Sequence, residues 1–192
     1  IVHKLDELNE KKLSELENRN DGKVQIIDVK LNNRKILLGI SEELNFKDKF
    51  EKFCILMDKI DKIGISGLKK EMKLNKFPTS SIKKLISLIE LKGNNSLKIN
   101  YVKTFLSNSK IGLEGISEIE NLMKIKSDFS LDFTLARGLS YYTSTIFEVV
   151  STNNVIGSLC GGGRYDDLFE ENNFLVTSVL CEILNLGNSP IK

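Results

Sequence analysis

Histidine and cysteine, the residues that most often build metal centres and nucleophilic sites, are scarce in this sequence. The single histidine, His3, has no partner near it in the sequence, so we expect a surface residue and no histidine-based catalysis. The three cysteines, Cys54, Cys160 and Cys181, are widely spaced and form no CxxC pair. This spacing favours neither a disulfide framework nor a zinc site, and we expect three reduced packing residues. No metal site is predicted.

Long apolar runs and a large excess of charge are also missing. No stretch approaches the roughly eighteen apolar residues that a membrane span needs, and the chain does not open with a basic and then apolar leader. We therefore expect a soluble, cytoplasmic protein with no membrane partner. The net charge of +2 does not by itself indicate nucleic-acid binding, because 26 acidic residues balance 28 basic ones. With 192 residues, the chain can bury a core in one or two domains.

Arginine is rare among the basic residues. Only positions 19, 34, 137 and 164 are arginine, and every other basic residue is lysine. The guanidinium group is a planar fork of donors that binds a carboxylate or a phosphate with two bonds, which a lysine cannot do. Arg137 and Arg164 lie close together in a region rich in glycine and tyrosine. We expect the functional site in that region.

The first part of the chain predicts a helix over residues 3–18 and a strand over residues 23–31, where the hydrophobic period is near two. A second helix should follow Asn33, with Arg34 at its start. Its expected apolar face consists of Ile36, Leu37, Ile40 and Leu44.

From Phe46 to about Lys126 the hydrophobic spacing of three and four residues predicts a small helical bundle. One helix should end at Gly64, and another should be capped by Ser80 or Ser81 and terminated by Gly93. The expected apolar faces are Phe50, Phe53, Met57 and Ile60; Ile82, Leu85, Ile86 and Ile89; Leu97, Tyr101 and Phe105; and Ile116, Ile119 and Met123.

A cluster of lysines lies within this helical region, at Lys69, Lys70, Lys73, Lys76, Lys83 and Lys84. A solvated helix face explains them. Contact with a phosphate backbone is the alternative, since lysine suits sequence-independent neutralisation of charge. No aromatic residues are interleaved to favour that alternative.

The period of two returns at residues 129–135, and two further strands are predicted over residues 142–150 and 155–161, joined by a turn at residues 151–154. The predicted fold class is α+β, with an antiparallel sheet flanked by helices and interrupted by a helical insertion. A doubly wound α/β fold is disfavoured because the last two strands are joined by a turn and not by a crossover helix. The expected organisation is a core region over residues 1–45, a helical insertion over 46–127 and the rest of the core over 128–192.

The glycines Gly161, Gly162 and Gly163 remove side chains from one strip of the sheet, so that a ligand could lie against the backbone. A glycine-rich bend without a ligand is the alternative. Arg137, Tyr141, Tyr142, Glu148 and Arg164 would surround the strip with hydroxyl groups and forks for an anion. Structural explanations are the alternative. Arg137 could form a surface salt bridge, and Glu148 could pair with Arg164 or cap the sheet edge. Adjacent tyrosines in a strand would face opposite sides of the sheet, so that one could be core while the other faces the site.

Two segments carry a family resemblance. Residues 135–148, LARGLSYYTSTIFE, resemble the first histidine-specific motif of histidyl-tRNA synthetases, commonly LARGLDYYTGTVFE. Residues 157–166, GSLCGGGRYD, resemble the second, GSxxGGGRYD. Residues 32–39 and 57–64 are similar to the segments that lead into the helical insertion of this family, and the resemblance covers residues 23–168.

The resemblance implies a class II synthetase core and the activity of a histidine–tRNA ligase, which activates histidine with ATP and transfers it to tRNA(His). By the resemblance, Arg137 is the catalytic arginine that binds the histidine carboxylate and the α-phosphate. Tyr142 would bind the substrate imidazole with Tyr141 beside it, and Gly161, Gly162 and Gly163 would form the pocket floor. Arg164 and Tyr165 belong to the motif and are expected to bind substrate. The resemblance also implies Mg²⁺ with ATP, although no ligand for it is evident, and a homodimer.

The sequence departs from the family pattern in several places. Ser140 replaces a usual aspartate or asparagine, and Ser144 a frequent glycine. We find no Phe-Arg-x-Glu pattern, no first dimer motif and no glycine-rich third motif with its arginine, and residues 169–192 do not resemble the family. We therefore expect that these 192 residues alone do not activate histidine. Two alternatives are a non-catalytic relative, such as the regulatory subunit of ATP phosphoribosyltransferase, and a plain interaction domain.

Overall fold

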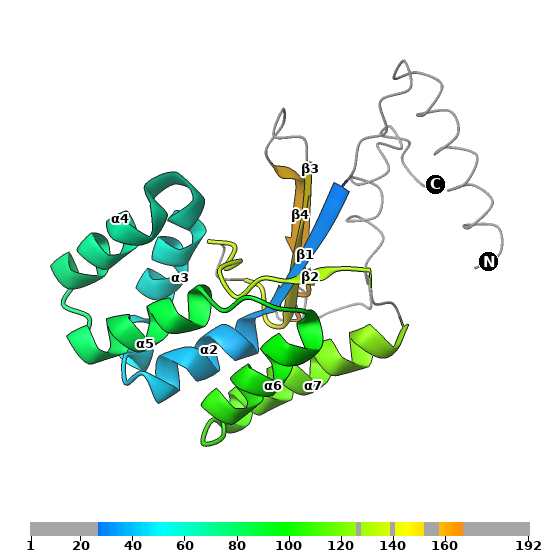
Figure 1. Cartoon of the computed structure of the whole chain (residues 1–192), viewed down its shortest axis with the longest axis horizontal. Helices are drawn as coiled ribbons and strands as arrows, with labels where there is room; N and C mark the ends of the chain where they lie inside the picture. Colours follow the sequence, from blue (N-terminus) through cyan, green and yellow to red (C-terminus); the bar gives the residue numbers. More distant parts are fainter. Residues whose placement is uncertain (1–26, 126–127, 139–140, 152–157, 167–192) are drawn as a thin grey trace, which may run out of the picture.

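The computed structural model describes residues 27–125, 128–138, 141–151 and 158–166. The helix predicted over residues 3–18, the turn predicted after Ser151 and residues 167–192 lie outside these ranges, as do His3, Ser140 and Cys181. Within them, a four-stranded sheet stands beside a group of helices (Figure 1).

The sheet has the strand order β2-β1-β3-β4. The strands are β1 (Ile27–Asn33), β2 (Ser130–Leu131), β3 (Thr145–Ser151) and β4 (Ser158–Gly163). β3 pairs antiparallel with both β1 and β4, which confirms the predicted antiparallel sheet. β2 differs, because it runs parallel to β1 for two residues after the chain returns through the helices.

The strand predicted over residues 129–135 is wrong beyond Leu131. The Asp132 carboxylate accepts a hydrogen bond from the backbone N–H of Thr134 at 2.9 Å, and the Leu135 N–H donates to the Asp132 carbonyl at 3.1 Å. An aspartate that binds the backbone two residues ahead forms a local turn. This turn ends the strand and directs the following residues across the sheet.

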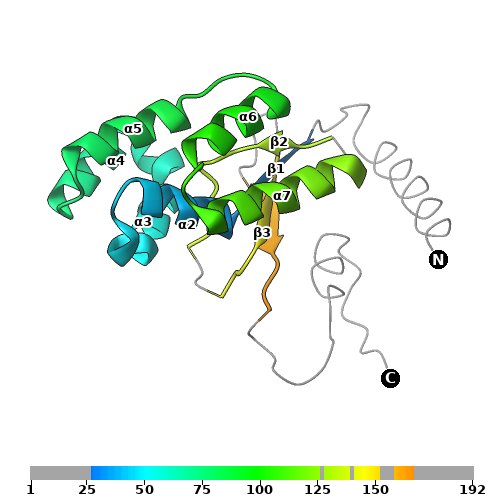
Figure 2. The same ribbon diagram turned by 90° about the horizontal axis from the view of Figure 1, so that it is seen from below.

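The sheet has two distinct faces, set by the alternation of side chains along each strand. The register places Lys30, Asn32, Ile146, Glu148, Gly161 and Gly163 on one side, here called the Glu148 face. The opposite side, the Phe147 face, carries Leu31, Asn33, Thr145, Phe147, Cys160 and Gly162. Helix α7 (Lys110–Ile125) packs against β1 and β3 (Figure 2). It lies on the Phe147 face, because Asn33 on that face donates a hydrogen bond to Glu118 of α7. The segment from Asp132 to Arg137 lies over the Glu148 face, where it contacts Lys30, Asn32 and Glu148.

Six helices lie among the described residues: α2 (Arg34–Glu43), α3 (Phe50–Asp58), α4 (Ile60–Leu74), α5 (Thr79–Ile89), α6 (Asn95–Phe105) and α7. A short 3-10 helix, η1 (Lys47–Lys49), precedes α3. The predicted apolar face of α2 is confirmed, since Ile36, Leu37, Ile40 and Leu44 are all buried. Helix α2 follows β1 directly and packs along α7, which ties the sheet to the helices.

Two predicted helix ends differ from the structure. Gly64 has φ 65° and lies inside α4, so it marks a kink between two helical segments instead of a stop. Helix α5 begins at Thr79 after Pro78, which takes the N-cap position without a side-chain cap. Ser81 lies in the first turn, and its hydroxyl donates to the Leu44 carbonyl at 2.7 Å, so it anchors α5 to α2 and caps nothing.

The predicted apolar face of α6 is also wrong in part. Leu97 is 59% exposed and Tyr101 is 43% exposed, whereas Ile99 and Val102 are buried. The sequence offers apolar residues on more than one side of this helix, and packing against α7 and β2 selects the side that is buried.

Cys54 is buried, and burial raises the pKa of its thiol to about 12, as expected of an unreactive packing residue. No helix in the described ranges is both long enough and apolar enough to cross a membrane.

Candidate active site

Arg137 lies over the Glu148 face of the sheet. Its backbone has φ 46°, a left-handed conformation that is uncommon for a residue other than glycine. Its side chain is 24% exposed, and its Nη1 is 3.6 Å from Glu148 Oε1. Glu148 therefore pairs with Arg137, and the predicted alternative of a pair with Arg164 is wrong.

Gly161 lies directly beneath the Arg137 side chain. It pairs with Glu148 across β3 and β4, on the same face of the sheet. A Cβ atom at position 161 would lie 2.5 Å from both Cζ and Nη2 of Arg137, closer than real Cβ contacts allow. The guanidinium can rest on the β4 backbone only because this residue is glycine.

Tyr142 occupies the next place along the same strip. Its side chain is buried, and a Cβ atom at Gly163 would lie 2.7 Å from the Tyr142 ring. Burial, together with a hydrogen bond with Tyr141, raises the pKa of Tyr142 to about 12. The phenol is therefore protonated at neutral pH and can donate a hydrogen bond.

Tyr141 lies beside Tyr142, with their ring centroids 4.6 Å apart, and Tyr165 approaches Tyr141 edge-on at 6.1 Å. The expectation that the two adjacent tyrosines face opposite sides of a strand was wrong. β3 begins only at Thr145, so residues 141 and 142 are not bound by strand alternation. Three tyrosine rings thus gather at one end of the glycine strip.

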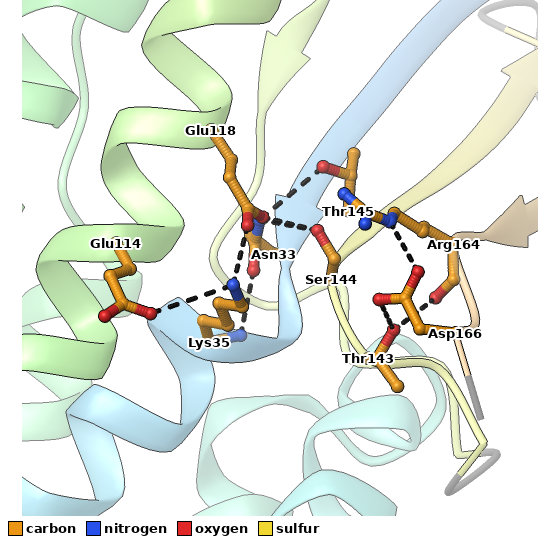
Figure 3. Close-up of polar contacts among 9 residues, drawn as sticks. All are labelled: Asn33, Lys35, Glu114, Glu118, Thr143, Ser144, Thr145, Arg164 and Asp166. Carbon is orange, nitrogen blue, oxygen red and sulfur yellow. Dashed lines mark hydrogen bonds and ion pairs between the residues drawn. The ribbon is translucent and has the colours of Figure 1, made fainter.

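Arg164 lies apart from this group. It follows Gly163, the last residue of β4, and its backbone N–H donates to the Thr145 carbonyl at 2.8 Å. Its Nε is 2.8 Å from Asp166 Oδ1, and the Thr143 hydroxyl donates to the other Asp166 oxygen at 2.8 Å (Figure 3). The Arg164 backbone contacts the segment before β3, because the Thr143 N–H donates to the Arg164 carbonyl at 2.9 Å. Gly162 pairs with Phe147 and is on the Phe147 face.

Arg34 was not among the site residues predicted from the sequence. It is 4% exposed, and its Nη1 donates to the carbonyls of Ala136 and Arg137, each at 3.4 Å. Its Nη2 is 3.4 Å from Glu51. Arginine is so scarce in this sequence that its presence at position 34, as at position 137, could have indicated a special role for Arg34.

Glu118 connects α7 to the β1–α2 junction and to Ser144, the residue before β3 (Figure 3). Its carboxylate accepts hydrogen bonds from Asn33 Nδ2 at 2.7 Å, from Lys35 Nζ at 2.7 Å and from the Ser144 hydroxyl. Asn33 is also the N-cap of α2, accepting from the Lys35 N–H at 2.8 Å. One carboxylate therefore joins α7, the β1–α2 junction and the residue before β3.

Replacing Glu118 with glutamine should lower the free energy of unfolding by about 2 kcal/mol at pH 7, because hydrogen bonds to a charged group are lost. Burial alone would raise the pKa of Glu118, but the bonds from Lys35, Ser144 and Asn33 outweigh it and hold the pKa below its usual value. A depressed folded-state pKa contributes stability above the unfolded value of about 4.3 and loses it as pH falls through the folded value. The difference between wild type and variant should therefore shrink below about pH 4.

Urea unfolding at pH 7 and at pH 3 measures this effect. Glu120→Gln is the matched control, since Glu120 lies on the same helix in an exposed pair with Lys103. We expect the control to change the unfolding free energy by less than about 1 kcal/mol. Equal losses for both variants, or a Glu118→Gln loss that persists at pH 3, would contradict the prediction.

A polar pocket adjoins the Arg137–Glu148 pair, between the sheet and helices α3 and α4. Lys30 and Asp132 form an ion pair at 3.0 Å in its wall. Its charged and polar lining consists of Lys30, Asp58, Asp61, Asp132, Thr134 and Glu148. In the part of the chain that the structure describes, no group of three or more Asp, Glu, His or Cys side chains is arranged to hold a metal ion.

Residues 16–173 match the profile of the family described as histidyl-tRNA synthetase. This chain belongs to the histidyl-tRNA synthetase family. The match confirms the resemblance seen in the two histidine-specific motifs. The histidine–tRNA ligase of Phocaeicola vulgatus is 43% identical over 168 residues, and that of Bacteroides fragilis strain YCH46 is 44% identical over 146 residues. These alignments include 84% and 73% of this chain but only 37% and 32% of the relatives, so the chain spans about a third of their length.

Solved structures agree with the family and the fold class. Histidyl-tRNA synthetase from Nostoc sp. PCC 7120 superposes with a TM-score of 0.70 at 27% identity, over 75% of this chain and 36% of that chain. A structure from Bacillus halodurans C, described as an ATP phosphoribosyltransferase regulatory subunit/histidyl-tRNA synthetase, has a TM-score of 0.59 at 19% identity, over 73% of this chain and 37% of that chain. At that identity the second likeness concerns the fold alone. The predicted α+β fold of a class II synthetase-like sheet interrupted by helices is confirmed.

Proposed function

We propose that this chain forms part of a histidine–tRNA ligase, which activates histidine with ATP to histidyl-adenylate and transfers it to tRNA(His). The observation that carries the proposal is the Arg137 guanidinium, which lies over Gly161 beside the buried side chain of Tyr142. A fixed guanidinium next to a neutral hydroxyl donor suits a small substrate that has both a carboxylate and a polar ring.

Arg137 is the proposed catalytic residue. Attack of the histidine carboxylate on the α-phosphate of ATP concentrates negative charge, and a guanidinium held in place stabilises that charge without proton transfer. The ion pair with Glu148 and the glycine beneath it fix the side chain before substrate arrives. This preorganisation is the protein's contribution to the activation step.

Tyr142 is proposed to bind the histidine imidazole, with Tyr141 and Tyr165 enclosing the same end of the pocket. Gly161 and Gly163 form its floor, and Gly162 maintains the strand between them. Arg164 stays in the proposal as a substrate contact that the family motif implies, although its side chain lies beside Asp166. Magnesium accompanies ATP in the proposed reaction, and the described residues supply no ligand cluster for it.

The proposed tRNA contact is the lysine cluster at residues 69–84. All six lysines are exposed, on α4, on α5 and in the connection between them. Phosphate contacts release counterions, so binding of tRNA that weakens steeply as salt rises supports this assignment. Binding that does not change when Lys69, Lys73 and Lys83 are replaced together by glutamine would remove it. A cytoplasmic homodimer is the proposed working form.

Histidine-dependent exchange of pyrophosphate into ATP tests the proposed function. The full-length protein should catalyse exchange with histidine and with no other amino acid. The 192-residue chain alone should not, because it lacks recognisable second and third class motifs. Exchange by the isolated chain would contradict the second expectation. Histidine binding without exchange by the full-length protein would favour a non-catalytic relative, and neither binding nor exchange would favour an interaction domain.

A further inference from the structure

We infer that Arg34 is a positioning residue for Arg137, holding the backbone that presents the catalytic guanidinium. This inference rests on the proposed function, since it assigns a role in the same reaction. Arg34 lies outside the two histidine-specific motifs, and it contacts the backbone at Arg137 but is assigned no contact with substrate.

The residues at the β1–α2 junction bind three successive carbonyls of the site segment. Asn32 Nδ2 donates to the Leu135 carbonyl at 2.8 Å, and Arg34 Nη1 donates to the carbonyls of Ala136 and Arg137 at 3.4 Å each. The Arg34 N–H also donates to the Ser144 carbonyl at 2.9 Å. Both ends of the loop that carries Arg137 are therefore attached to the same short stretch of chain.

Arg137 needs such an attachment. Its φ of 46° is a conformation that a side-chain-bearing residue avoids by roughly 1 kcal/mol or more, so the loop relaxes unless its surroundings hold it. A carbonyl that accepts a bond from a buried guanidinium is fixed in direction. The bonds at Ala136 and Arg137 thus set where the Arg137 side chain leaves the backbone.

Arginine suits this position and lysine does not. The Arg34 guanidinium uses one nitrogen for the two carbonyls and another for Glu51, and its plane lies over the Phe50 ring with Cζ 5.0 Å from the centroid. A lysine ammonium is a single point of charge and cannot contact the two carbonyls, Glu51 and the Phe50 ring together. Glu51 and Phe50 belong to α3, so the anchor of the loop extends into the helical region.

A double-mutant cycle on the full-length protein tests the inference, using Arg34→Lys and Arg137→Ala with steady-state pyrophosphate exchange. Arg34→Lys should lower kcat by about tenfold to a hundredfold while changing KM for histidine and ATP by less than about threefold, because displacing a catalytic group by an ångström has effects of this size. In the Arg137→Ala background the same change should alter kcat by less than about threefold. Lys47→Met, at an exposed lysine paired with Glu42, is the control and should leave both constants unchanged.

Equal losses of kcat in both backgrounds would overturn the inference, as would a rise in KM at constant kcat. Should Arg34→Lys fail to fold, Glu51→Gln takes its place in the cycle, since Glu51 is 59% exposed and its loss only loosens the anchor. That variant should lower kcat by about twofold to fivefold, and only while Arg137 is present. A wild-type protein without exchange would refute the proposed function, and the inference falls with it; an active wild type with additive variants refutes the inference alone.

Discussion

Replacing Arg137 with alanine is expected to lower kcat for histidine activation by about a hundredfold to a thousandfold, the scale of losing one donor that stabilises charge in a transition state. Lysine should not rescue the activity, because its ammonium cannot keep both the pairing with Glu148 and a two-bond contact with substrate. The measurement is histidine-dependent pyrophosphate exchange by the full-length protein.

Arg164→Ala is the natural comparison for that experiment. Arg164 is an arginine of the same region, but its side chain is 62% exposed and pairs with Asp166. We expect a loss of kcat of less than about tenfold, since an exposed ion pair holds its partners only weakly. If Arg137→Ala retained most of the activity while Arg164→Ala abolished it, the assignment of the catalytic arginine would be wrong.

Replacing Gly161 with alanine is expected to lower kcat by at least about tenfold with little change in stability. The new Cβ atom would lie 2.5 Å from the Arg137 guanidinium, which is the far end of a flexible side chain. The side chain can move away at small energetic cost, so the fold survives. The guanidinium then no longer lies where it meets the substrate.

Urea unfolding and pyrophosphate exchange, measured on the same preparation, separate these two effects. The matched control is Gly161→Ala in the Arg137→Ala background, where the guanidinium is gone and the extra methyl group meets no clash with it. There, the glycine change should alter the remaining activity by less than about threefold. A large drop in unfolding free energy in either background would mean that Gly161 serves the sheet and not the arginine.

The success and the limits of the sequence-based predictions have physical causes. The pairing of β3 with β4 was predictable because two apolar runs on either side of a predicted turn favour a local antiparallel pair. That pairing alone brings Glu148 opposite Gly161. The strand predicted over residues 129–135 failed beyond Leu131 because the Asp132 side chain competes for the backbone, an effect that periodicity does not register.

The tyrosines and the arginines illustrate the same limit at the site. Strand alternation was applied to Tyr141 and Tyr142, but β3 begins only at Thr145, so their rings lie together. Arg34 and Arg137 are more than a hundred residues apart in the chain, and no local pattern indicates that one binds the carbonyl of the other. Contacts between distant segments depend on how the helices fold back on the sheet.

By itself, the sequence determined the family, the α+β fold class, the β3–β4 pairing and the buried face of α2. It also indicated the region that we propose as the site. These features follow from local spacing or from motifs, which can be recognised in the sequence without a structure. Only the tertiary structure decided that Arg137 lies over Gly161 on the Glu148 face while Arg164 pairs with Asp166, and that Arg34 is buried against the backbone of the loop that carries Arg137. The reason is that a loop residue has no fixed periodicity. The direction of its side chain is therefore set by distant groups that bind the carbonyls of the loop.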